Sequence, residues 1–540
     1  AISAEGTKAA HAPGRPPRPH FTGCHGDMGG RATKLQSPVV VPKSGKTSCG
    51  PDEQIPTEQR RRKLQSVVVL DHTVKRKRDI LCCPCLEGIS MQRKVEVEAS
   101  LPAVVARFAD PKAVAREAVV LVMVGLPARG KSYLSGAVFR HLRLLGVRVR
   151  SFNAGELRRT TGAAGGAGAQ ADYFSMSNSD AKSERERLAM QCCESLLDWI
   201  RQAPPNTSSV GILDATNTTR ARRSKVLSLI RDAAREMAAD GEGKHAPVRL
   251  IFLESLCDDP RLLQDNYRMK LHNDDYKGAT DHQAALQDFQ ARVAAYEAQY
   301  EPLEERELEC PQEDGVCVPV GCMRIFNGGE KIVCCRVGAS LVAAPIISLL
   351  HSMHLTPRRI ILAARAGEES DEVDPGRLAA LLQEAEQVDG KPIDVLCSAD
   401  RHGAELAQQL VNRPCPQCGA AGQPRQQPRA VLTLRALGTR SAANGDGSVE
   451  ESYADLVRRM RSEVILLIER LPRSVLVVCP GEDVRRVLMA HFLGCEDRSI
   501  SDMRVPKGKA LQLNRDHKGF SAREVPYPLP AVKARTRLLN

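Results

Sequence analysis

The sequence predicts an α/β protein built from two successive α/β blocks. Three observations lead to this prediction. Short apolar runs of strand length alternate with longer amphipathic stretches, first from about residue 118 and again from about residue 358. A glycine-rich loop connects the first of these runs to the helix-like stretch after it. The chain has 540 residues, 42% of them hydrophobic, which suffices for two or three folded units.

The first block contains four apolar runs that predict the strands of a parallel sheet. They cover residues 119–124, 147–152, 210–213 and 248–253. A helix-like stretch follows each run, and the first of these covers residues 133–145. Because a strand, helix and strand in succession place both strands parallel, we expect helices to flank the sheet.

The second block repeats this alternation and predicts a second α/β domain. Its strand-like runs cover residues 360–364, 393–397 and 474–479, and residues 484–493 resemble a helix. Residues 414–428 are rich in Pro and Gln, and residues 441–448 are rich in small side chains. Both of these segments are typical of loops.

The apolar segments and the cysteines of the sequence indicate where in the cell the protein is expected. The longest apolar stretch, residues 337–350, is interrupted by Gly338, Pro345 and two serines. It is shorter than the roughly 20 apolar residues that a membrane helix needs, so we expect neither a transmembrane helix nor a membrane partner. The 18 cysteines form no regular framework, which favours a reducing, cytoplasmic location.

Basic residues are concentrated near the start of the chain. The formal charge is +12, and residues 1–100 contain 17 Lys and Arg against 10 Asp and Glu. Tight basic runs cover residues 60–63 and 75–78, within sequence rich in Pro, Gly and Ser. Such runs can bind nucleic acid, acidic lipid or an import receptor, but a solvated tail is the commoner case. We therefore predict a disordered basic region over residues 1–113 and no nucleic-acid partner.

The glycine-rich loop has the pattern GxxxxGK[ST] of a phosphate-binding loop. Backbone N–H groups in such a loop wrap the nucleotide phosphates, the lysine reaches the β and γ groups, and the hydroxyl holds Mg²⁺. A strand precedes the loop and a helix follows it, as this mechanism requires. We therefore predict that ATP and Mg²⁺ bind here, at Gly125, Leu126, Pro127, Ala128, Arg129, Gly130, Lys131, Ser132 and Tyr133.

Asp214 ends the third apolar run, where a phosphate-binding loop needs a carboxylate on a neighbouring strand. This carboxylate can hold Mg²⁺, accept a proton from the acceptor hydroxyl, or cap the next helix. The sequence leaves these three roles open. Arg220, Arg222 and Arg223 follow closely and can clamp an anionic acceptor.

Five motifs resemble, in order, the kinase half of the bifunctional 6-phosphofructo-2-kinase/fructose-2,6-bisphosphatase family. They are GLPARGKSY (125–133), FNAGELRR (152–159), DATNTTRARR (214–223), ESLCDDP (254–260) and YEAQYEPL (296–303). The resemblance implies a P-loop NTPase-type kinase domain over residues 114–335. It also implies transfer of the γ-phosphate of ATP to the 2-hydroxyl of fructose 6-phosphate.

The resemblance assigns roles to individual residues. Arginines are expected to grip the phosphate of the sugar because the guanidinium fork donates two parallel hydrogen bonds to phosphate oxygens. The catalytic residues are expected to be Lys131, Asp214 and Lys270, with Ser132 and Asp214 on the metal and Asn266 in the nucleotide site. The residues implied at the sugar phosphate are Arg158, Arg185, Thr216, Arg222, Lys270, Arg292 and Tyr296.

Residues 354–368 resemble the start of the phosphatase half of the same family, which has a histidine-phosphatase fold. Ala366 stands where the family has its nucleophilic histidine, and Pro480 where it has a second histidine. His402 aligns with a phosphate-binding arginine, although Arg401 is adjacent. Because an alanine methyl group cannot attack phosphorus, residues 355–515 are expected to fold without bisphosphatase activity. A tail follows over residues 516–540.

Two other functions remain open at this stage. The loop can serve a kinase for another acceptor, such as a nucleic-acid end, or an adaptor that binds nucleotide without catalysis. Intact Lys131, Ser132 and Asp214 argue against the adaptor. The expected ligands are ATP and fructose 6-phosphate, and the resemblance allows a homodimer.

Overall fold

The structure is a computed structural model of the chain. It describes residues 67–71, 117–161, 171–175, 177–205, 207–241, 244–271, 275–276, 280–309, 317–338, 340–353, 358–364, 375–411, 430–440, 450–494, 499–515 and 519–527. All of these residues belong to one unit, Thr57–Asn540.

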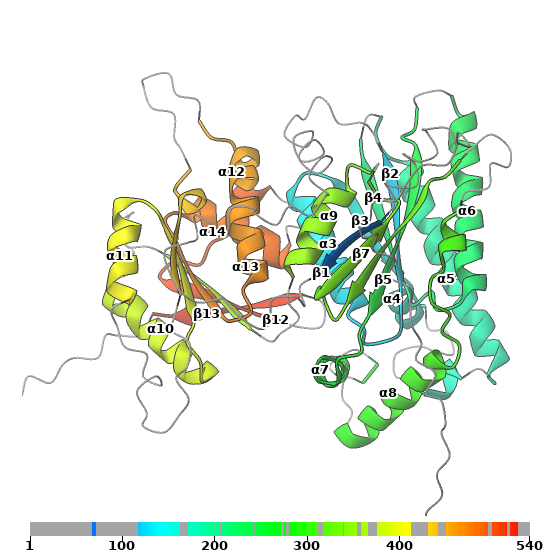
Figure 1. Ribbon diagram of the computed structural model, residues 1–540, viewed down its shortest axis with the longest axis horizontal. Coiled ribbons are helices and arrows are strands. Elements are labelled where there is room, and N and C mark those ends of the chain that lie inside the picture. Colours follow the sequence, from blue (N-terminus) through cyan, green and yellow to red (C-terminus); the bar gives the residue numbers. More distant parts are fainter. Residues whose placement is uncertain are drawn as a thin grey trace, which may run out of the picture. The chain divides into compact units, whose positions relative to one another are not determined.

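The first sheet has the strand order β1-β7-β6-β5-β2-β4-β3 (Figure 1). Its five strands from β3 to β6 are parallel, whereas β7 and β1 are antiparallel to their neighbours. All four strands predicted for the first block are present. The strands are β1 (Val67–Asp71), β2 (Ala118–Val124), β3 (Arg148–Asn153), β4 (Ser209–Asp214), β5 (Val248–Leu256), β6 (Val320–Phe326) and β7 (Lys331–Cys335).

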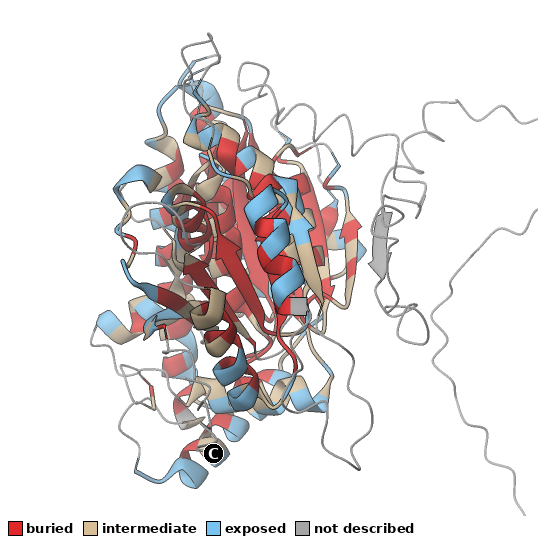
Figure 2. Cartoon of the chain, turned by 90° about the vertical axis from the view of Figure 1, so that its left-hand side faces the viewer, coloured by how far each residue is buried: buried red, intermediate tan, exposed pale blue. Residues whose placement is uncertain are grey.

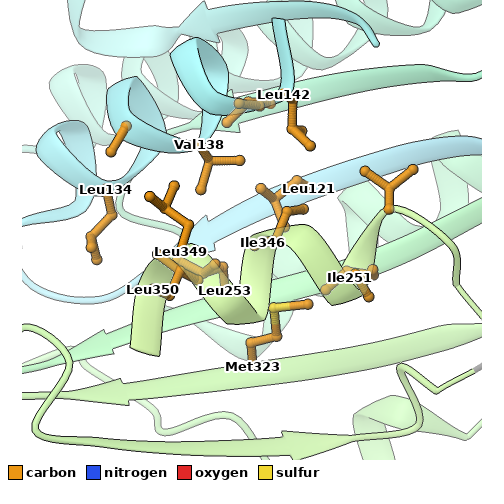
Figure 3. Close-up of a cluster of buried hydrophobic side chains, with 14 of the residues drawn as sticks. Leu121, Leu134, Val138, Leu142, Ile251, Leu253, Met323, Ile346, Leu349 and Leu350 are labelled. Carbon is orange, nitrogen blue, oxygen red and sulfur yellow. The ribbon is translucent and has the colours of Figure 1, made fainter. Parts of the chain in front are cut away.

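Helices cover both faces of the first sheet, which explains why its central strands are apolar along their whole length. Strands β2 and β4 are buried at every position. Helices α5 (Ser179–Arg201) and α6 (Arg220–Ala239) cover one face. Helices α3 (Lys131–Leu144) and α9 (Ala343–Ser352) cover the other, where leucines of both helices and Ile346 of α9 pack near Leu121 (Figure 3).

Further helices follow the strand ends of the first sheet and carry side chains of the site described below. Helix α4 (Ala154–Thr160) follows β3, α7 (Pro260–Lys270) follows β5, and α8 (His282–Glu297) comes after α7. Short helical turns lie at η3 (Ala171–Phe174) and η4 (Glu305–Leu308). Each of the three α-helices has an Asn or Asp at its N-cap that accepts hydrogen bonds from the first turn.

The second sheet has the order β10-β9-β11-β8-β12-β13. Its first four strands are parallel, and β12 and β13 are antiparallel additions. The strands are β8 (Arg359–Ala364), β9 (Asp394–Ser398), β10 (Val431–Leu434), β11 (Val475–Cys479), β12 (Lys509–Arg515) and β13 (Phe520–Pro526). The principal helices are α10 (Pro375–Asp389), α11 (Arg401–Val411), α12 (Tyr453–Met460), α13 (Leu466–Arg470) and α14 (Glu482–Leu493), and η5, η6 and η7 cover Arg435–Leu437, Arg461–Ile465 and Ile500–Asp502.

The second sheet is covered on both faces as well. One apolar cluster contains residues of α12, α13 and α14, and the other contains residues of α10 and α11. Figure 2 shows the consequence for burial, since the strands are largely buried while the helices also present exposed positions. The α/β prediction for both blocks is therefore confirmed.

Three elements lie outside the domain limits predicted from the sequence. Val67–Asp71 forms β1 within the region expected to be disordered, because this apolar, β-branched run pairs with the edge strand β7. Helix α9 follows residue 335 but packs in the core of the first sheet. Strand β13 lies in the expected tail and completes the second sheet. The rest of the predicted disordered region lies outside the described residues.

The sequence predicts no transmembrane helix. Among the helices that the structure describes, none is both long enough and apolar enough to cross a membrane.

Candidate active site

The phosphate-binding loop takes a backbone path that requires glycine at two positions. Gly125 has φ +135°, and a Cβ atom there would lie 2.6 Å from the carbonyl oxygen of Ser255. Gly130 has φ 85° and precedes α3 directly. Ala128 adopts a left-handed conformation as well, with φ 56°. A non-glycine residue in that region stores strain, which is common where a loop is shaped for a ligand.

Neighbouring elements hold the loop in this conformation. The Asn266 side chain on α7 donates a hydrogen bond to the carbonyl of Ala128 at 3.0 Å. The Ser255 hydroxyl at the end of β5 donates to the carbonyl of Arg129. The loop is therefore anchored from two segments that lie more than a hundred residues away along the chain.

Lys131 lines a cavity beside the phosphate-binding loop. Its Nζ atom donates to the carbonyl oxygen of Leu126 at 2.6 Å, and the residue is 8% exposed. Burial lowers the pKa of Lys131 to about 7; Asp214 opposes this shift, and Lys270 adds to it. Burial also lowers the pKa of Lys270. An anion bound beside Lys131 would favour its charged form.

This pKa predicts that nucleotide binding is coupled to proton uptake. Since bound phosphates favour the ammonium form of Lys131, binding of Mg–ATP should take up about 0.1 proton through this group at pH 6 and about 0.9 at pH 8. Calorimetric titration at each pH, in buffers of different ionisation enthalpy, measures this number. Uptake that does not increase from pH 6 to pH 8 would contradict the assignment.

Asp214 ends β4 and faces the same cavity as Ser132. Its Oδ2 atom accepts hydrogen bonds from the Asn153 side chain at 2.6 Å and from the Ser135 hydroxyl at 3.4 Å. Thr219 caps the following helix, so Asp214 does not have that role. A hydroxyl and a carboxylate are the oxygen ligands that Mg²⁺ accepts, and these two residues fit such an ion.

Arginines from four different helices also line this cavity, whose volume is about 360 Å³. They are Arg158 on α4, Arg185 on α5, Arg222 on α6 and Arg292 on α8. Residues from 158 to 292 are thus brought to one place by the fold. We call these four residues the arginine cluster.

Aromatic side chains and carboxylates organise the arginine cluster. The guanidinium carbon of Arg292 lies 3.7 Å from the centroid of the Phe174 ring, within the range of a cation–π contact. Asp275 pairs with Arg158 at 2.5 Å and with Arg292 at 3.1 Å. Burial by itself would raise the pKa of Asp275, but Arg292 and Arg158 outweigh it and lower the pKa.

The remaining two members of the arginine cluster are also held in place. Glu186 accepts a hydrogen bond from Arg222 Nε at 2.7 Å. Arg185 donates to the carbonyl of Tyr173. The guanidinium groups are therefore oriented by protein acceptors, and a bound phosphate would have to share or replace these partners.

The structure places most of the predicted site residues in this single cavity. Gly125 and Leu126 do not line it and instead shape the loop, and the Arg129 side chain turns away to pair with Glu297 at 2.9 Å. The predicted residues that line it are Pro127, Ala128, Gly130, Lys131, Ser132, Tyr133, Arg158, Arg185, Asp214, Thr216, Arg222, Asn266, Lys270, Arg292 and Tyr296.

Several cavity residues were missed by sequence reasoning. Asp275 and Phe174 gave no local signal, since an acidic residue beside a second one and a pair of neighbouring aromatics are common in loops. Arg515 on β12 also lines the cavity, and its guanidinium carbon lies 4.4 Å from the centroid of the Tyr133 ring. Tyr133 and Arg515 are so distant in sequence that no local pattern could have predicted their contact.

The strand ends of the second sheet, where the resemblance places the phosphatase site, are only partly covered by the described residues. Arg365, Ala366 and Glu368, which follow β8, lie outside the described residues. Pro480 is buried directly after β11. Arg401 is 87% exposed and pairs with Glu405 on the same helix at 3.0 Å, so it does not point toward the neighbouring strand ends. The backbone N–H of Ala364 donates to the Tyr527 hydroxyl at 2.8 Å.

Comparison with known proteins agrees with this geometry. A family model described as 6-phosphofructo-2-kinase matches residues 110–314, which include the phosphate-binding loop and the arginine cluster. Over this part, the chain is similar to curated proteins named 6-phosphofructo-2-kinase/fructose-2,6-bisphosphatase. The enzyme of that name from Caenorhabditis elegans is 33% identical over 306 residues, 54% of this chain and 61% of the relative.

Two further relatives extend the comparison. The 6-phosphofructo-2-kinase/fructose-2,6-bisphosphatase of Arabidopsis thaliana is 28% identical, with 73% of this chain and 52% of the relative aligned. The 6-phosphofructo-2-kinase 1 of Saccharomyces cerevisiae is 34% identical, with 48% and 28% aligned. The chain thus spans less than two thirds of these relatives. Among solved structures, a fungal RNA kinase aligns with a TM-score of 0.25 and 11% identity, covering 39% of this chain and 77% of its own.

Proposed function

We propose that this chain is a member of the 6-phosphofructo-2-kinase/fructose-2,6-bisphosphatase family and that it transfers the γ-phosphate of ATP to the 2-hydroxyl of fructose 6-phosphate. One observation carries the proposal: the arginine cluster and the phosphate-binding loop line the same cavity. A nucleotide and a phosphorylated acceptor therefore each have a set of cationic or N–H groups in one cavity. The names of the relatives supply the identity of the acceptor.

Phosphoryl transfer of this kind depends on alignment and on neutralisation of charge. Backbone N–H groups of the loop would hold the β- and γ-phosphates, and Lys131 and Lys270 would carry positive charge to the transferring group. Mg²⁺ held by Ser132 and Asp214 would neutralise charge on the phosphate oxygens. Asp214 would also accept the proton of the attacking hydroxyl.

The arginine cluster would bind the 6-phosphate of the sugar. A phosphate carries more negative charge than the Asp275 carboxylate that now pairs with Arg158 and Arg292. It also accepts bidentate hydrogen bonds from guanidinium groups. Thr216, which lines the cavity at the strand end, would contact the sugar and leave its 2-hydroxyl facing the γ-phosphate.

The activity can be tested by following the product. Purified protein with ATP, Mg²⁺ and fructose 6-phosphate should release ADP and form a sugar bisphosphate whose 2-phosphate is lost in mild acid. The acid treatment should regenerate fructose 6-phosphate, because an anomeric phosphate is acid-labile. Formation of an acid-stable product, or ADP release that does not depend on the sugar, would contradict the proposed acceptor.

We further propose that the second domain lacks fructose-2,6-bisphosphatase activity. Ala366 cannot take a phosphoryl group, and Pro480 cannot donate a proton or bind phosphate through its ring. We expect incubation with fructose 2,6-bisphosphate to release no more phosphate than an Arg365→Ala variant releases. Turnover that depends on Arg365, measured as inorganic phosphate, would show that a different residue serves as nucleophile. A cytoplasmic location and a homodimer stay predictions.

A further inference from the structure

Two cysteines face each other across the hairpin of β6 and β7, on the side of the first sheet away from α3. Cys322 and Cys335 are direct partners in the antiparallel register. Their side chains therefore project from the same face of the sheet, and both belong to the cluster under α5 and α6. Directly opposed residues have Cα atoms about 4.5 or 5.5 Å apart. Both separations lie within the range that a disulfide spans.

The two thiols differ in exposure and acidity. Cys322 is 0% exposed, whereas Cys335 is partly exposed. The two side chains interact across the hairpin, and this interaction is the main reason why the pKa of Cys335 lies below its ordinary value and that of Cys322 above it. Arg324, on the same face of β6, also lowers the pKa of Cys335. Cys335, which is more exposed and has the lower pKa, is thus the better nucleophile.

We propose that Cys322 and Cys335 form a reversible redox pair that a hydroperoxide converts into a cross-strand disulfide. The Cys335 thiolate attacks the terminal peroxide oxygen and breaks the O–O bond, which leaves Cys335 as a sulfenic acid and, after protonation, releases water or an alcohol. The Cys322 sulfur then attacks the sulfenic sulfur. The S–S bond forms, and the hydroxyl group leaves with the Cys322 proton as water. Two thiols have lost two electrons and the peroxide has gained them.

Cys334 provides a matched control within the same strand. It lies next to Cys335 but is 1% exposed and belongs to the cluster on the opposite face of the sheet. Its register partner is Met323. The pleat of the strand therefore keeps the Cys334 sulfur away from Cys322.

Mass spectrometry of the full chain tests the pair. Protein treated with hydrogen peroxide is alkylated with N-ethylmaleimide and digested without reduction. We expect a peptide that joins Cys322 to Cys335 and disappears after dithiothreitol. It should persist in Cys334→Ala and be lost in Cys335→Ser. In Cys322→Ser, the sulfenic acid of Cys335 should accumulate and be trapped by dimedone, since its resolving thiol is gone.

The outcome in the unmutated protein is decisive even if a variant fails to fold. Cys335 recovered as a sulfinic acid with Cys322 still alkylated would overturn the inference. So would a disulfide from Cys335 to any other cysteine, including those outside the described residues. The result does not depend on the proposed kinase activity, because the readout is the bond itself.

Discussion

Replacing Lys131 with alanine is expected to lower kcat/KM for fructose 6-phosphate phosphorylation by about 10²–10³-fold. The amine lies in the phosphate-binding cavity, where its charge acts in a medium that excludes most water. No other described side chain of the loop carries a cation into this cavity, since Arg129 is buried against Glu297 and does not line the cavity. Steady-state assays with ATP and the sugar varied in turn measure the effect.

Lys182→Ala is the control for the Lys131 variant. Lys182 is an exposed lysine on α5, so its removal changes net charge equally without touching the cavity. We expect its kinetic constants to match those of the unmutated protein. If Lys131→Ala keeps a normal secondary structure by circular dichroism and still turns over at the unmutated rate, the loop is not the catalytic phosphate site.

Replacing Arg292 with alanine is expected to raise the KM for fructose 6-phosphate by about 10- to 100-fold, which corresponds to the loss of one charge-assisted hydrogen bond. The KM for ATP should change little, because Arg292 belongs to the arginine cluster and not to the loop. Arg292 is suited to this test because Asp275 keeps Arg158 as a partner when Arg292 is removed. Arg158 is more deeply buried, and its removal would take away the closer of the two arginine partners of Asp275.

Arg187→Ala is the matched control for Arg292. Arg187 lies on the exposed side of α5 and pairs with Glu184 at 2.8 Å. Exposed ion pairs of this kind contribute little to stability, so both KM values should stay unchanged. An Arg292→Ala enzyme that loses affinity for ATP and the sugar equally would indicate a general disturbance of the cavity. That result would not support a sugar-phosphate site.

The phosphate-binding loop could be predicted from sequence because its chemistry is local. A strand, a turn with glycines at positions 125 and 130, a lysine and a hydroxyl stand in consecutive residues. The same holds for Asp214, whose place at a strand end follows from the apolar run before it. Most of the predicted strands were found for a similar reason, since β2, β4 and β11 are continuous apolar runs buried at every position. Strand β3 departs from this pattern, because two of its positions are exposed.

The arginine cluster could not be derived from any single segment. Its four members come from four helices, and only resemblance to a family placed them at one ligand. Asp275 and Phe174 were missed because their roles depend on tertiary packing, which brings one carboxylate to two guanidinium groups and one ring beneath Arg292. Helix α9 and strand β13 lie outside the predicted domain limits. The order of elements along the chain does not reveal which hydrophobic core or sheet each element joins.

A crystal structure with a non-hydrolysable ATP analogue, Mg²⁺ and fructose 6-phosphate tests the account most directly. The account predicts that oxygens of the 6-phosphate lie within hydrogen-bond distance of Arg158 and Arg292, with Asp275 displaced from at least one of them. The 2-hydroxyl should face the terminal phosphate beside Lys131. A sugar phosphate bound outside this cavity, or bound within it without contact to the arginine cluster, would contradict the account.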